Sequence, residues 1–131
     1  VKILSGKDVI ITPHEGELIS ILPDLSGSLI DKALKAAKIL NTIVVLKGAT
    51  TIIASPNNKA LVNTAGAKWL ATAGSGDVLA GIIGGLLSNK MDTFYAAAYA
   101  VWLHSEAGKY LGPGLVAEDI PKILPKILKN I

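Results

Sequence analysis

The stretch Thr72-Ala73-Gly74-Ser75-Gly76-Asp77, followed by the apolar run 78–87, is the most informative part of the sequence. A glycine loop that leads directly into a helix leaves several backbone N–H groups unpaired and pointing in one direction. Together with the helix dipole, these groups form a binding site for an anion such as phosphate. Gly74 and Gly76 lack a Cβ, so a ligand can approach the backbone closely. The alternative is that Ser75 or Asp77 simply caps the helix, because both residue types are preferred at that position.

The helix that follows the loop contains three more glycines, Gly81, Gly84 and Gly85. Each costs roughly 1 kcal/mol relative to alanine inside a helix, so we expect close packing to require them. Nearly all faces of this helix are apolar, which predicts a buried helix rather than an amphipathic one.

Composition restricts the class of protein. The chain has 131 residues, half of them hydrophobic, which predicts one packed domain or part of one rather than disorder. No apolar run reaches the roughly 18–20 residues that span a bilayer, and no signal peptide is visible, so we expect no membrane association. The absence of cysteine excludes disulfides and cysteine metal sites and fits a cytoplasmic setting. The net charge of +3 comes from scattered lysines without arginine, too diffuse for a nucleic-acid-binding surface.

Two β-branched runs predict two strands of an α/β sheet. Val9–Thr12 and Ile43–Leu46 have the composition of strands buried on both faces. His14 follows the first run and Lys47 follows the second. Ligands of open α/β sheets bind beyond the carboxyl ends of the strands, so both residues are candidates for a site. The simpler alternatives are a solvated loop histidine and a surface lysine in a tight turn.

Helix and hairpin signals surround these strands. Ser28 and Asp31 have the spacing of a capping box, and apolar residues follow at helical intervals to Leu40. The segments 51–54 and 60–63, on either side of a Pro-Asn-Asn turn, predict a hairpin.

The C-terminal part of the sequence predicts two more helices. Asp92 is a suitable N-cap for the first, and His104 lies on its apolar face. We interpret His104 as a buried, hydrogen-bonded histidine rather than a catalytic one. Gly108 and the segment 112–114 predict a loop, and the last helix is expected to begin near Ala117.

Four motifs occur in an order that closely resembles the ADP/ATP-dependent NAD(P)H-hydrate dehydratases of the ribokinase-like superfamily. They are residues 11–17 (ITPHEGE), 44–50 (VVLKGAT), 69–83 (WLATAGSGDVLAGII) and 100–104 (AVWLH). The resemblance implies a three-layer α/β fold with a sheet flanked by helices. Catalytic domains of this family extend beyond the length of this chain. We therefore expect residues 1–131 to be the C-terminal portion of a single ribokinase-like domain whose N-terminal half is absent from the chain.

The resemblance also implies an activity. The family repairs hydrated NADH and NADPH (NADHX and NADPHX) by a nucleotide-dependent dehydration that regenerates the dinucleotide. A nucleotide phosphate activates the hydroxyl, which is then eliminated; bacterial members typically use ADP and eukaryotic ones ATP. We expect Mg²⁺ as cofactor, because the site must offset the nucleotide charge without arginine.

The resemblance assigns roles to individual positions. His14 matches the contact to the hydrated dinucleotide, and Asp77 matches the aspartate beside the substrate hydroxyl, the expected general base. The segment Gly74-Ser75-Gly76 would form the anion hole for the transferring phosphoryl group. The residues matched to the adenine nucleotide are Lys47, Gly48, Ala49, Thr50, Thr51 and Gly76.

The sequence departs from the family pattern at two positions: Ala73, within the glycine loop, replaces a glycine, and Ala67, before it, replaces an asparagine whose amide could make a polar contact. We expect NAD(P)HX and an adenine nucleotide as ligands. We also expect the chain to associate with itself or with the missing half of the domain, because a sheet cut in half leaves an unpaired edge.

Two other functions are compatible with the sequence. A small-molecule kinase of the same superfamily, of the vitamin or hydroxyethylthiazole type, would share the glycine loop, although the Lys-Gly-Ala-Thr and Thr-Pro-His motifs argue against it. A non-catalytic remnant or subunit that binds nucleotide would fit a chain that carries only part of a domain.

Overall fold

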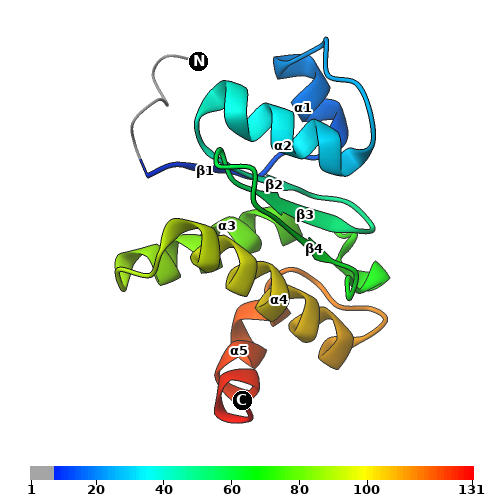
Figure 1. The fold of residues 1–131 in the computed structure, drawn as a ribbon. Helices are drawn as coiled ribbons and strands as arrows, with labels where there is room; N and C mark the ends of the chain where they lie inside the picture. Colours follow the sequence, from blue (N-terminus) through cyan, green and yellow to red (C-terminus); the bar gives the residue numbers. More distant parts are fainter. Residues whose placement is uncertain (1–7) are drawn as a thin grey trace.

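Strand β2 (Ile43–Leu46) is fully buried and sends alternate side chains to two separate cores. Ile43 and Val45 face one core, whereas Val44 and Leu46 face the other, as the two-residue period of a strand requires. A strand buried on both sides needs a helical layer on each face. The structure, a computed structural model that describes residues 8–131, has this three-layer arrangement (Figure 1).

The central sheet has four strands in the order β1–β2–β3–β4. Besides β2, they are β1 (Ile10–Ile11), β3 (Thr51–Ala54) and β4 (Ala60–Asn63). Helices α1 (Glu15–Ile21) and α2 (Leu29–Leu40) lie on one side, and α3 (Ser75–Ser88) and α4 (Thr93–Leu111) lie on the other (Figure 1). Helix α5 (Asp119–Lys129) packs on α4, and a short 3₁₀ helix, η1 (Lys68–Leu70), precedes α3. The predicted α/β class and its three layers are confirmed.

The first two strands run parallel, so their carboxyl ends lie at the same edge of the sheet. Ile10 pairs with Ile43 and Ile11 with Val44. The parallel backbone pairing continues past the ends of the strands. His14 and Lys47 form an isolated parallel β-bridge, and the Lys47 N–H donates to the Pro13 carbonyl at 2.8 Å. The antiparallel strands β3 and β4 form the predicted hairpin.

Local capping sets the start of several helices. The Ser28 Oγ accepts from the Asp31 N–H at 3.1 Å, and the Asp31 carboxylate accepts from the Ser28 N–H at 2.9 Å, so the predicted capping box is confirmed. Asp92 caps α4 as predicted, since its carboxylate accepts from the N–H groups of Phe94 and Tyr95. Within residues 8–131, no helix is both long and apolar enough to cross a membrane.

The prediction that α3 is buried on nearly all faces was wrong. Ser75, Leu79 and Ile83 are its buried residues, and a Cβ added at Gly81, Gly84 or Gly85 would meet nothing within 4 Å. Close packing of α3 against other described residues therefore does not explain its three glycines or its apolar sequence. One face packs against α4 and the sheet, and the small residues lie on the open face.

The start of α3 also differs from the capping alternative. Its N-cap is Gly74, with φ of +83°, and no side chain caps the helix. Neither Ser75 nor Asp77 is the cap, because the helix already begins at Ser75. A left-handed backbone at the cap favours glycine, since a Cβ would be strained there.

Gly108 lies inside α4 rather than in a loop, which corrects a second prediction. A Cβ at Gly108 would lie 2.6 Å from Leu70 Cγ and 2.9 Å from Ala67 Cβ. The glycine is therefore explained by the close approach of the segment before α3, not by a chain break. The helix ends at Leu111, and Gly112, whose φ is +69°, is its C-cap.

Two helical glycines offer a matched test of this packing. Gly108→Ala should lower the free energy of unfolding by about 1–3 kcal/mol, because the new methyl group overpacks the contact with Leu70. Gly81→Ala should instead raise it by up to about 1 kcal/mol, the helix-propensity gain at an open position. Urea denaturation measures both, and an equal gain in the two variants would contradict the assigned contact.

Candidate functional site

Three segments far apart in the sequence converge at one edge of the sheet. His14 follows β1, Lys47 follows β2, and α3 points its N-terminus at the same place. The Lys47 Nζ lies 3.2 Å from the position that a Cβ on Gly76 would occupy. A side chain at Gly76 would therefore displace the ammonium group, so the missing Cβ lets the lysine reach the helix terminus.

A cavity of about 760 Å³ opens between these segments. Seven of the predicted site residues line it: His14, Lys47, Gly48, Ala49, Thr51, Ser75 and Gly76. The other predicted residues, Thr50, Gly74 and Asp77, are not part of its wall. Its remaining lining residues, which the predicted site did not include, are Gly66, Ala67, Lys68, Leu70, Ala71, Thr72, Leu79, Val101, His104 and Ser105.

The first turn of α3 has unpaired backbone donors. The Ser75 N–H donates to the Thr72 carbonyl at 3.2 Å, and the first bond back from the helix runs from Val78 N–H to the Gly74 carbonyl at 3.1 Å. Between them, the N–H groups of Gly76 and Asp77 have no backbone acceptor within the described residues. Two free donors at the positive end of a helix dipole suit an anion.

Lys47 adds a full positive charge to this terminus. Within residues 8–131, no carboxylate forms an ion pair with it. The Glu17 carboxylate is near enough for its charge to interact with Lys47, but it is not at ion-pair distance, so the ammonium group can pair with a ligand anion. Lys68, a second lysine of the cavity wall, lies 4.4 Å from the centre of the Trp69 ring.

His14 is held in one orientation by the start of α1. Its Nδ1 accepts from the Glu17 N–H at 3.1 Å, while the His14 N–H donates to the Glu17 carboxylate at 2.7 Å. A nitrogen that accepts carries no proton, so the neutral ring carries its proton on Nε2. The His14 backbone N–H lowers the pKa of Glu17, and the nearby charge of Lys47 lowers it further. The result is an exposed imidazole whose Nε2 lies 3.5 Å from the Glu17 carboxylate, beyond a strong hydrogen bond, so its proton can still be donated to a ligand.

Asp77 lies in the first turn of α3 with an exposed side chain. Its backbone N–H belongs to the anion-facing pair, whereas its carboxylate does not line the cavity. The geometry therefore places this carboxylate beside the cavity rather than in its wall.

His104 lies on α4 at the bottom of the same cavity. Its ring is buried, and Nε2 lies 2.9 Å from the Ser75 Oγ and 3.0 Å from the Ser75 carbonyl oxygen. The prediction of a buried, hydrogen-bonded histidine is confirmed. Burial lowers the pKa of His104, and the bond to the Ser75 carbonyl partly offsets that effect. Helical periodicity predicted that His104 lies on the apolar face of its helix. It could not predict that His104 contacts Ser75 in the glycine loop.

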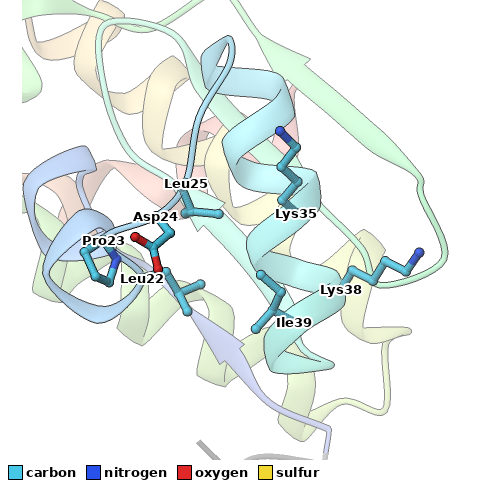
Figure 2. Close-up of a pocket in the computed structure, with 7 residues that line it drawn as sticks. All are labelled: Leu22, Pro23, Asp24, Leu25, Lys35, Lys38 and Ile39. Carbon is cyan, nitrogen blue, oxygen red and sulfur yellow. The ribbon is translucent and has the colours of Figure 1, made fainter.

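A smaller cavity of about 300 Å³ lies between α2 and the loop that follows α1. Figure 2 shows Leu22, Leu25 and Ile39 around it, with the ammonium groups of Lys35 and Lys38 extending away from these apolar side chains. The Lys35 Nζ donates to the Ser26 carbonyl at 2.9 Å. None of its lining residues belongs to the predicted site.

Comparison with known proteins identifies the family. A family model described as NAD(P)H-hydrate dehydratase matches residues 3–128. The chain belongs to the NAD(P)H-hydrate dehydratase family. The ADP-dependent (S)-NAD(P)H-hydrate dehydratase of Xanthomonas campestris is 35% identical over 96% of this chain and 47% of that protein. The bifunctional NAD(P)H-hydrate repair enzyme Nnr of Moorella thermoacetica is 34% identical over 99% of this chain and 27% of that protein.

A solved structure agrees with this assignment. The ADP/ATP-dependent NAD(P)H-hydrate dehydratase from Bacillus subtilis, co-crystallised with ATP/Mg²⁺ and soaked with CoA, matches with a TM-score of 0.86 and 31% identity. The match covers 97% of this chain and 53% of that protein. The fold is thus that of the dehydratase family, and the chain spans about half the length, or less, of the relatives described.

The burial of His104 makes stability depend on pH. Because its pKa in the folded state lies below the ordinary value of 6.5, the unfolded chain binds more protons in the pH range between the two. The free energy of unfolding should therefore fall as pH decreases through about 6.5. Urea denaturation between pH 8 and pH 5.5 measures this slope. His104→Gln should remove it, and an identical slope in both proteins would contradict the assignment to His104.

Proposed function

We propose that this chain carries the nucleotide-binding and catalytic part of an enzyme that dehydrates NADHX and NADPHX to NADH and NADPH. The proposal makes it a carbon–oxygen lyase with ADP or ATP as co-substrate. The observation that carries it is the position of the Lys47 ammonium, 3.2 Å from where a Gly76 Cβ would lie at the N-terminus of α3, within a chain that belongs to the dehydratase family. A lysine and free helix N–H groups bind phosphate oxygens well.

The nucleotide is proposed to lie along the segment after β2. Lys47, Gly48, Ala49 and Thr51 form one wall of the cavity, and Thr50 lies in the same segment. Gly76 lines the same cavity, and its N–H, which has no backbone acceptor in the described residues, can meet a phosphate oxygen. This arrangement supports a nucleotide whose phosphates point at α3, since positioning and charge stabilisation dominate phosphoryl transfer.

The hydrated dinucleotide is proposed to contact His14 and Asp77. The Nε2–H of His14 can donate to the substrate, and the Asp77 carboxylate can accept the proton of the substrate hydroxyl. The phosphoryl group passes from the nucleotide to that hydroxyl oxygen. Loss of phosphate and a proton then restores the double bond, and ADP would leave as AMP.

Mg²⁺ is proposed to arrive with the nucleotide. Within the part of the chain that the structure describes, no group of three histidine or acidic side chains could hold a metal ion by itself. Mg²⁺ usually keeps several waters and is held in large part by substrate phosphates, so the nucleotide itself would supply the main ligands here. The ion would neutralise charge on the transferring phosphoryl group.

The partners of this chain are proposed to include more protein. Among the described strands β1 is an edge strand, and the open face of α3 carries Gly81, Gly84 and Gly85. An unpaired sheet edge and an uncovered apolar face favour association. Either a second copy or the remainder of a dehydratase domain could cover them.

Lys47→Ala tests the nucleotide segment. The change removes the charge at the α3 terminus, so ADP and ATP should bind about 1–3 kcal/mol more weakly in the full-length protein. Isothermal titration calorimetry measures the affinity. Lys38→Ala, which removes an exposed lysine of α2, controls for the loss of net charge. Equal affinities of the Lys47 and Lys38 variants would mean that residues 47–51 form only a turn.

Asp77→Asn separates catalysis from folding. Asparagine is nearly isosteric and no side chain caps this helix, so the fold should lose only a dipole interaction of about 0.3–1 kcal/mol. Loss of a general base slows reactions about 10²–10⁴-fold, so kcat should fall strongly while the nucleotide affinity stays near normal. Turnover of NADHX and a thermal melt measure the two effects. Retained turnover with a lowered melting temperature would place the base elsewhere.

A further inference from the structure

The buried pair of Ser75 and His104 has a chemical consequence for the cavity. The two side chains come from α3 and α4, both line the cavity, and both are less than a tenth exposed. The His104 Nε2 lies within hydrogen-bond distance of two Ser75 atoms, the carbonyl oxygen at 3.0 Å and the Oγ at 2.9 Å.

The carbonyl contact determines which nitrogen of His104 carries the proton. A carbonyl oxygen can only accept, so Nε2 must be protonated to hydrogen-bond with it. If Nε2 were bare, two acceptors would face each other 3.0 Å apart inside the protein. Burial keeps the ring neutral by lowering the pKa of His104, so Nδ1 is the unprotonated nitrogen.

The same proton assigns the role of the Ser75 hydroxyl. Because Nε2 is a donor, the Ser75 Oγ beside it can only accept from the ring. Within residues 8–131, the Ser75 Oγ has no other hydrogen-bond partner. Its own proton is thus uncommitted, next to the free N–H groups of Gly76 and Asp77.

The other buried serine hydroxyl of the cavity, that of Ser105, differs from the hydroxyl of Ser75. Ser105 is also buried and lines the cavity, but its Oγ donates to the Val101 carbonyl at 2.9 Å and accepts from the Asn63 side chain at 2.7 Å. Of these two hydroxyls, only that of Ser75 keeps a proton for a ligand.

We propose that His104 is a positioning residue that turns the Ser75 hydroxyl proton toward the cavity, where it donates to a phosphate oxygen of the bound nucleotide. This proposal rests on the proposed function, which supplies the phosphate. The hydroxyl becomes a third neutral donor beside Gly76 and Asp77, with Lys47 as the charged one. Such a set suits a doubly charged phosphate group rather than a neutral ligand.

Variants of the pair test the proposal with ADP and inorganic phosphate as probes on the full chain. Ser75→Ala should weaken ADP binding about tenfold to a hundredfold, as expected for one hydrogen bond to a charged group. Ser105→Ala, the matched hydroxyl deletion, should weaken it far less. His104→Leu should weaken ADP binding, because the Ser75 hydroxyl, no longer held by the ring, turns to donate to a backbone carbonyl. In that variant, the further change Ser75→Ala should lower the ADP affinity by less than about threefold.

His104→Gln tests rescue. Its side-chain amide can still donate to the Ser75 carbonyl, so it should restore most of the ADP affinity and the full Ser75→Ala effect. A structural role alone would not restore this coupling. If Ser75→Ala lowers the ADP affinity by the same factor in the unsubstituted protein and in the His104→Leu variant, the role of His104 is overturned while the proposed function stands. If neither ADP nor phosphate binds the unsubstituted chain, both proposals fail.

The protonated nitrogen can be observed without any ligand. The chain has two histidines, so ¹H–¹⁵N spectra of the imidazole nitrogens can be assigned by comparison with His104→Gln. The Nε2–H form of His104 is expected. The Nδ1–H form would overturn the proposal whatever the binding measurements show.

Discussion

The close approach of the Lys47 ammonium to the start of α3 at Gly76 depends on the sheet and on the helical layer formed by α3 and α4. Lys47 is held at the end of β2 by its pairing with the segment after β1. The N-terminus of α3 is held by Leu79 and Ile83, which pack into the core beneath the sheet. Because the lysine and the helix terminus come from elements joined by that core, the packing of apolar side chains sets the position of the charge.

Much of the fold could be predicted because its signals are local. β2 and the hairpin follow from short β-branched runs and a turn, and the capping box of Ser28 and Asp31 involves residues three positions apart. The faces of α3 could not be predicted in this way. Apolar composition indicates that a helix is buried somewhere, but which face is covered depends on elements distant in the sequence. The same holds for Gly108, whose neighbour Leu70 lies far from it along the chain.

The candidate site was predictable to the extent that strand ends indicate it. His14 and Lys47 could be proposed because parallel strands bring their carboxyl ends together. The contribution of His104 could not, since periodicity assigns a residue to a face without showing what meets that face. The proposed role of Asp77 has a different basis from those of His14 and Lys47. It comes from the resemblance to the dehydratase family, and the Asp77 carboxylate lies outside the cavity wall. A carboxylate at a helix start has no distinctive pattern of its own.

The capping box of α1 gives His14 a preorganised ring. A histidine that only touched a ligand would have to give up its rotational freedom at the moment of binding, and that ordering would weaken the complex. Here the Glu17 N–H already immobilises the imidazole through Nδ1, so the loss of side-chain entropy occurs when the helix forms. If His14 contacts the dinucleotide as proposed, the folding of α1 prepares that part of the binding surface, and a chain in which this helix frays would lose the contact before it loses its core.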